Sequence, residues 1–166
     1  VEDTLSSFAD FFNGEDPSRT TVNTLGEAFV GNRNGGSVVK LLPGECPDTN
    51  GDGVITTSSA WNNVYAWGNN PQQSSDDCVA WRTELEGGAP RYVRAMAAQD
   101  VFGLDGRIES YVWLGDSDYD GGSIWKIDGR SGEVLFRTKG AGCKPYGFAL
   151  DGRNPQNLWG SCRSNN

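Results

Sequence analysis

The sequence contains no histidine among its 166 residues. This absence removes the commonest general base and any Ser-His or Cys-His nucleophile. The chain also has no G-x-S-x-G turn and no glycine-rich phosphate loop. Carboxylates are numerous, but nothing in their spacing singles out the acid and base pair of a glycosidase. We therefore expect a protein that is not an enzyme.

Basic residues are few and scattered. Lys and Arg number 14 against 22 Asp and Glu, which gives a net charge of −8, and no run rich in Lys or Arg occurs. Because phosphate binding needs a clustered basic footprint, a nucleic-acid partner is not expected. Long apolar runs are missing too, so the sequence predicts no membrane span.

The four cysteines favour disulfides over a metal site. The sequence has no Cys-x-x-Cys spacing and no histidine that could complete a zinc site. Four cysteines allow three pairings, of which we predict Cys46–Cys78 and Cys143–Cys162. Disulfides imply an oxidising compartment, so we expect an extracellular or cell-surface protein. The alternative is four buried free thiols in a cytosolic domain.

A calcium loop is predicted between the first two cysteines. Asp48, Asn50 and Asp52 carry oxygens at positions one, three and five, and these can converge on one hard cation if the chain then turns sharply at Gly53. Val54 would add its carbonyl. Ile55 is expected to anchor the loop in apolar surroundings.

This loop differs from an EF-hand at its end. Ser59 stands where a bidentate Glu is usual, and no helical periodicity precedes the loop. We therefore expect an EF-hand-like calcium loop outside an EF-hand, with Asp76 or Asp77 completing the coordination. The alternative is an acidic turn without metal, because Asn-Gly and Asp-Gly are common turn formers.

A second, weaker calcium candidate comes later in the chain. Asp116, Asp118 and Asp120 repeat the one-three-five spacing before Gly121, but Ser123 replaces the apolar eighth residue. A solvated acidic turn explains the pattern equally well. Asp100 and Asp105 are expected to be ordinary turn and surface charges.

An internal repeat indicates an all-β fold. Each unit has a strand, a turn with glycine, a strand, a Gly-Ser hairpin and a further strand. After the second unit, residues 128–136 add a tight turn and an outer strand, which makes a four-stranded antiparallel meander the size of one propeller blade. The repeated stretches are residues 17–41, 90–136 and, as a shorter third copy, 145–161.

These repeats resemble a known group of proteins. The Gly-Ser-Val/Ile-x-Lys-Leu/Ile pattern at residues 36–41 and 122–127 is similar to that of secreted bacterial β-propellers related to streptogramin (virginiamycin B) lyases and to NHL/SMP-30-type repeats. The cysteine-bounded loop resembles an insertion seen in an uncharacterised branch. The resemblance implies β-propeller-like blades. Lyase activity is not carried over, because those enzymes rely on histidine and this chain has none.

The repeat count sets the expected organisation. We predict one domain over residues 1–166, with a first blade core at 17–41, the calcium-loop insertion at 42–80, a second blade at 81–140 and the start of a further blade at 141–166. A closed propeller needs at least four blades. Either neighbouring copies complete the sheets, or the chain is part of a longer one.

We therefore expect a non-enzymatic extracellular module, stabilised by calcium and disulfides. Unpaired strand edges favour pairing with copies of itself, as a self-assembling subunit of a fibre or surface layer. The alternative is a fragment of a streptogramin-lyase-like enzyme or of a carbohydrate-binding propeller. Trp61, Tyr65 and Trp67 in the insertion either pack it onto the blade or form a platform for glycans. Residues 1–13 are either one or two helical turns or an outer strand.

Overall fold

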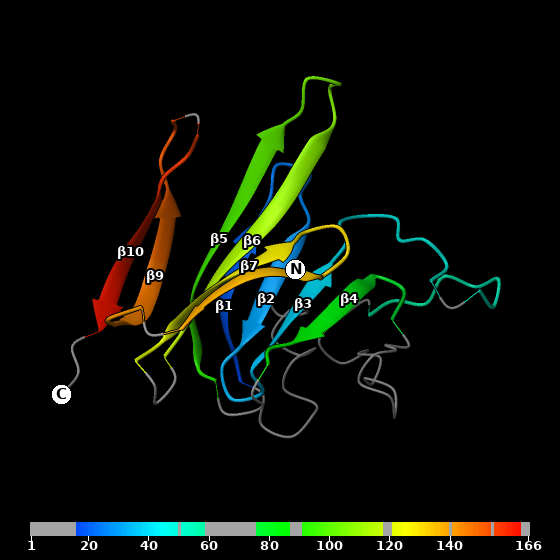
Figure 1. Cartoon of the computed structure of the whole chain (residues 1–166). Coiled ribbons are helices and arrows are strands. Elements are labelled where there is room, and N and C mark those ends of the chain that lie inside the picture. The colour runs from blue at the N-terminus through cyan, green and yellow to red at the C-terminus, as the bar shows by residue number, and fades with distance from the viewer. Residues whose placement is uncertain are drawn as a thin grey trace.

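The computed structural model describes residues 16–49, 51–58, 76–86, 91–117, 121–139, 141–153 and 155–163. In these residues the chain forms β-strands and no helix (Figure 1). The strands are β1 (Pro17–Val22), β2 (Ala28–Asn32), β3 (Ser37–Leu41), β4 (Val79–Glu84), β5 (Val93–Phe102), β6 (Ile108–Asp116), β7 (Ser123–Asp128), β8 (Val134–Lys139), β9 (Lys144–Leu150) and β10 (Leu158–Arg163).

The strands form three antiparallel sheets. The first has the order β1-β2-β3-β4, the second β5-β6-β7-β8, and the third contains β9 and β10. The all-β prediction and the four-stranded antiparallel meander are therefore confirmed. Across the described ranges the three sheets do not close into a ring. No helix in those ranges is long and apolar enough to cross a membrane.

The boundary between the first two units differs from the predicted one. The predicted second blade begins at residue 81, whereas the structure places residues 79–84 in β4, the fourth strand of the first sheet. The loop segment thus lies between the third and fourth strands of one sheet. Residues 1–13, together with Trp61, Tyr65 and Trp67, lie outside the described residues.

The two four-stranded sheets share one register, bulges included. Asn32 pairs with Ser37 in the first sheet, as Asp116 pairs with Ser123 in the second. We call the first strand of each sheet (β1, β5 and β9) its inner strand and the last two of each four-stranded sheet its outer strands. In both four-stranded sheets a register shift follows the first residue of the inner strand, and another interrupts the pairing of the two outer strands. The third sheet repeats the first of these shifts, between Ser161 and Cys162. The repeat seen in the sequence is therefore a repeat of backbone geometry.

The entry to the inner strand is also the same in both sheets. Asp16 and Tyr92 precede β1 and β5 with φ angles of 49° and 50°, which are uncommon for residues other than glycine. The carbonyl of Asp16 accepts a hydrogen bond from Arg33 N, and that of Tyr92 accepts one from Ser117 N. These bonds hold the strained entry in place in each sheet.

Neighbouring sheets approach closely at equivalent glycines. A Cβ on Gly31 would lie 2.6 Å from Val93 Cγ1, and a Cβ on Gly115 would lie 2.4 Å from Pro145 Cβ. Each glycine lies on the second strand of its sheet and contacts the first strand of the next one. Ser161 occupies the equivalent position in the third sheet and is exposed. The main core lies between the first two sheets and includes Phe29, Val38, Leu85, Val93, Met96, Val112, Leu114, Trp125 and Ile127.

Candidate functional site

The predicted calcium loop is folded around the Asp48 carboxylate. Asp48 Oδ1 accepts a hydrogen bond from Gly51 N at 2.6 Å, and Oδ2 accepts one from Gly53 N at 2.8 Å. Gly53 has a φ of 84°, a conformation that glycine adopts without steric cost, and it supplies the predicted sharp turn. Asn50 lies outside the described residues.

The second half of the loop lies at the surface. Asp52 Oδ1 accepts a hydrogen bond from Val54 N at 2.8 Å, which turns the chain after the fifth loop position. The prediction that Ile55 anchors the loop in apolar surroundings is wrong, because Ile55 is 55% exposed. Polar contacts hold the loop instead of an apolar anchor.

The fully buried Asp77 joins the two ends of the loop. Its Oδ1 accepts hydrogen bonds from the Thr49 amide at 2.9 Å and the Thr49 hydroxyl at 2.7 Å. Its Oδ2 accepts a bond from the Thr56 amide at 2.7 Å and a longer one from the Thr56 hydroxyl. The hydrogen bond from the Thr49 hydroxyl, followed by that from the Thr56 amide, lowers the Asp77 pKa to about 2.

Asp76 continues the same arrangement one residue earlier. Its Oδ2 accepts hydrogen bonds from the Ser58 amide at 2.7 Å and the Ser58 hydroxyl at 2.9 Å, and Oδ1 accepts one from the Cys78 amide. Asp76 is fully buried. The two aspartates therefore anchor the loop to the start of β4. We call the segment between β3 and β4 the excursion.

The loop offers only oxygen ligands, which suits a hard cation such as calcium. Asp48, Asp52 and the Val54 carbonyl lie within one turn of the chain, and the amide bonds to Asp48 fix that carboxylate. Backbone amides donate to the carboxylates of Asp48, Asp76 and Asp77 alike, and these donors compete with a cation for the same oxygens. No group of three or more carboxylates or cysteines within the described ranges could hold a metal ion. Calcium binding by this loop stays a prediction.

The second acidic candidate is used differently from its predicted role. Asp116 is fully buried, and its carboxylate accepts hydrogen bonds from Ser123 N at 2.9 Å and Trp125 Nε1 at 2.7 Å. Arg91 Nη1 lies 3.6 Å from the same carboxylate. Asp116 thus links β6 to β7 inside the sheet, while Asp118 and Asp120 lie outside the described residues.

Both predicted disulfides are present. Cys46 is bonded to Cys78, which closes the base of the excursion beside Asp77. Cys143 is bonded to Cys162, which ties the entry of β9 to the end of β10. The two bonds indicate an oxidising, non-cytoplasmic environment.

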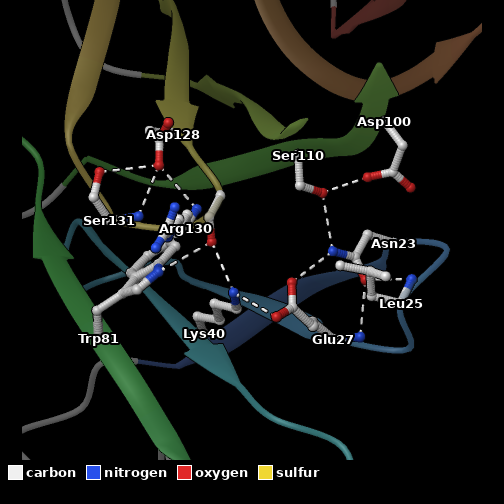
Figure 2. A network of polar contacts seen from close by, with 11 residues as sticks. Asn23, Leu25, Glu27, Lys40, Trp81, Asp100, Ser110, Asp128, Arg130 and Ser131 are labelled. Atoms are coloured by element: carbon white, nitrogen blue, oxygen red, sulfur yellow. Dashed lines mark hydrogen bonds and ion pairs between the residues drawn. The ribbon is translucent and has the colours of Figure 1, made fainter. Parts of the chain in front are cut away.

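A buried polar network links the first two sheets (Figure 2). Lys40 Nζ forms an ion pair with Glu27 at 2.7 Å and donates a hydrogen bond to the Gly129 carbonyl at 2.9 Å. Trp81 Nε1 donates to the same carbonyl at 3.2 Å. Two side chains of the first sheet thus converge on one turn of the second sheet.

The network continues through the turn between β1 and β2. Asn23 Nδ2 donates to Glu27 Oε2 at 2.7 Å and to Ser110 Oγ at 2.9 Å, and the Ser110 hydroxyl donates to Asp100. Asp100 also accepts a hydrogen bond from Thr24 N at 2.7 Å. The expectation that Asp100 is an ordinary surface charge is therefore wrong, because it bridges the two sheets. No local pattern marks a residue whose partners lie so far away in the sequence.

A cavity of about 410 Å³ opens beside this network. Its buried wall carries the Lys40–Glu27 pair, so the innermost carboxylate is already neutralised by a lysine. At the rim, burial acts to raise the pKa of Asp128, but hydrogen bonds from Ser131 and Arg130 outweigh it and leave that pKa lowered. This chemistry supports a structural link rather than an acid and base pair. The lining residues are Leu25, Glu27, Lys40, Asp105, Arg107, Ile108, Glu109, Ser110, Tyr111, Asp128 and Arg130.

The second sheet has one face in the core shared with the first sheet, and its other face is partly open to solvent. Lys126 Nζ lies 3.6 Å from the centre of the Tyr111 ring and 5.5 Å from that of Trp113. Phe136, which pairs with Lys126 across the strands, is 49% exposed. The third sheet packs on β5 and β6 with only two strands, so it leaves this outer part of the face uncovered.

Comparisons of the chain with protein-family models, with curated proteins and with solved structures found no significant match. The resemblance to extracellular propellers therefore rests on the repeat residues alone.

Proposed function

We propose that this chain is a non-enzymatic extracellular structural module, built of propeller-like blades, that assembles with copies of itself. The observation that carries the proposal is the third sheet, which has two strands within the described residues. Its strand β10 has one hydrogen-bonded neighbour, whereas the equivalent strands β2 and β6 have two. A strand from another copy can pair with the free edge of β10 and extend the sheet.

The surface beside this edge suits such an addition. Trp159 on β10 is 62% exposed, and Phe136 lies on the uncovered part of the second sheet. In the first sheet the residue equivalent to Phe136 is Trp81, which packs against Gly132 of the next sheet. Strands added beyond β10 would cover Phe136 in the same way. Pairing with a different edge strand of the next copy generates rings or fibres, and pairing of β10 with itself generates closed dimers.

The association is tested by sedimentation velocity over a range of protein concentrations. We expect the wild-type chain to form dimers or larger species as concentration rises. Phe136→Glu places a charge on the open surface and should leave the protein monomeric, because burying an unpaired carboxylate is costly. Leu104→Glu is the matched control, since Leu104 is fully exposed in the β5–β6 turn.

Two results contradict the proposal. One is a wild-type chain that stays monomeric at every concentration. The other is association that Phe136→Glu and Leu104→Glu change equally. A monomer with measurable turnover would favour the lyase-like fragment instead, and a monomer that binds polysaccharide would favour the carbohydrate-binding propeller.

Calcium is the second part of the proposal. Asp48, Asn50, Asp52 and the Val54 carbonyl would hold the ion, while Asp76 and Asp77 keep the loop closed around it. A ligand that binds only the folded state stabilises it by about 2.7 kcal/mol at a hundred times its Kd. Calcium should therefore raise the melting temperature, and a chelator should reverse the rise.

The calcium assay has a matched pair of variants. Asp52→Ala should abolish the calcium response, whereas Asp105→Ala, which changes an Asp in an exposed turn, should keep it. A wild-type melting temperature that does not change with calcium would contradict calcium binding by the loop.

A further inference from the structure

Four arginines that are far apart in the sequence gather at one end of the sheets. Two of them lie near the starts of β1 and β5, one follows β2 and one ends β10. Arg19 Cζ lies 4.9 Å from the centre of the Tyr146 ring, and Arg94 Cζ lies 6.0 Å from it. Arg33 and Arg163 are close enough to act on the charge of Arg94. The chain carries only 14 basic residues and a net charge of −8, so this gathering is a local reversal of its overall charge.

Within the described residues, one of the four arginines of this cluster, Arg33, forms an ion pair. Arg33 pairs with Asp16 at 2.7 Å. Arg19 Nε donates to the Arg94 carbonyl at 2.8 Å and Nη1 to the Ser18 carbonyl, so it is held by backbone oxygens. In the described part of the chain, the guanidinium groups of Arg94 and Arg163 form no ion pair and no hydrogen bond.

The strand pairing adds a like-charge contact. Lys144 and Arg163 stand directly opposite each other in β9 and β10. Like charges at such positions destabilise a sheet. Burial lowers the pKa of Arg94, and the charges of Arg33, Arg19 and Arg163 lower it further. An anion placed here would relieve both effects.

A cavity of about 580 Å³ lies between these groups. It is lined by Arg94, Tyr146, Ser161, Cys162 and Arg163. The Cys143–Cys162 disulfide fixes one of its walls. Arg94, Arg163 and Ser161 therefore border one open space at the surface.

We propose that this cavity binds an oxyanion: a carboxylate, sulfate or phosphate group. The planar guanidinium of Arg94 or Arg163 can donate two parallel hydrogen bonds to such a group. Tyr146 orients Arg19 and Arg94 through its ring, and the Ser161 hydroxyl offers a further donor. The site is separate from the calcium loop and from Phe136, and it shares β10 with the edge that we propose pairs with another copy.

Calorimetric titration tests the site with three probes: sodium citrate, sodium sulfate and sodium phosphate. Ionic strength is held at about 0.1 M with sodium chloride, so that general screening is constant. We expect saturable binding of at least one probe, and the probe that binds most tightly identifies the anionic group. Arg94→Gln and Arg163→Gln should each weaken that binding by about tenfold or more.

Arg107→Gln is the matched control, because Arg107 is exposed in the turn at the other end of β5. It should leave binding unchanged. Arg163 is exposed at the end of β10, so its substitution keeps the test independent of folding. The inference is overturned if no probe binds saturably, or if Arg163→Gln and Arg107→Gln bind as the wild type does.

Discussion

The interface between the first and second sheets and the interface between the second and third begin alike and end differently. Both start from a glycine on the second strand that touches the inner strand of the next sheet. Beyond that contact, Lys40 reaches a carbonyl in the turn of the second sheet, whereas the equivalent Lys126 lies over two aromatic rings of its own sheet.

The difference shows what the outer strands contribute. In the first interface the β7–β8 turn supplies the Gly129 carbonyl to Lys40 and Trp81, and the Gly132 carbonyl to Thr83 at 2.6 Å. The third sheet has no strands that could supply such a turn within the described residues. The same sequence pattern therefore occurs in two different interfaces. The one between the first and second sheets is sealed, because a turn covers its outer strands, and the one between the second and third sheets is open.

The largest expected effect on stability comes from replacing Lys40 with methionine, and the equivalent replacement of Lys126 is the comparison. Lys40→Met leaves the Glu27 carboxylate in a largely buried site without its partner, which should cost about 3–5 kcal/mol in unfolding free energy. Lys126→Met loses a cation–π contact at the surface and should cost about 0.5–1 kcal/mol. Urea unfolding of both variants measures the difference.

Glu27→Gln in the Lys40→Met background is the control. It removes the unpaired charge and should recover part of the lost stability. Equal costs for the two lysine substitutions would contradict the view that one interface is sealed and the other open.

An intermediate effect is expected from the disulfide of the third sheet. The double substitution Cys143→Ser and Cys162→Ser should lower the local stability of β9 and β10 by about 2–4 kcal/mol. The first two sheets should keep their own stability, because their shared core contains no residue of β9 or β10. Amide hydrogen exchange reads the two regions separately. A uniform loss of protection over all three sheets would show that the open interface is as cooperative as the sealed one.

The smallest expected effect is the loss of stability when the Asp77 carboxylate of the loop is protonated by acid. The loop lies in neither interface. The folded Asp77 has a pKa of about 2, below the ordinary value of 3.8. Its contribution to stability is therefore complete above pH 4 and is lost as pH falls through about 2. The amide signals of Thr49 and Thr56 should report this titration by NMR. Asp77→Asn should remove that acid dependence, and an Asp77 pKa near 4 would contradict the anchor role.

Local sequence patterns could predict the strands because the structure repeats them. Gly-Ser hairpins and alternating apolar residues mark β2, β3, β6 and β7, and the cysteine pairing followed from the same layout. The place of β4 could not be read this way. It pairs with β3 across the whole excursion, and no local pattern records such a long-range pairing.

The sites show the same limit. Asp76 or Asp77 was predicted to complete the calcium coordination, and this stays a prediction. In the structure both carboxylates accept hydrogen bonds from amide and hydroxyl donors of the loop. The arginine cluster could not be predicted from the sequence, because Arg19, Arg94 and Arg163 form no run in it. The packing of β1 on β5 and of β5 on β9, together with the pairing of β9 with β10, brings them together.

The most direct test is residue-resolved amide hydrogen exchange of β10 at two protein concentrations. In dilute protein, about half of the β10 amides should exchange rapidly, because antiparallel strands bond each neighbour through alternate residues and β10 has one neighbour. The amides of β2 and β6 should all be protected. At high concentration β10 should become protected like β6. Protection of β10 that is complete in dilute protein, or that does not change with concentration, would contradict the incomplete third sheet and its completion by another copy.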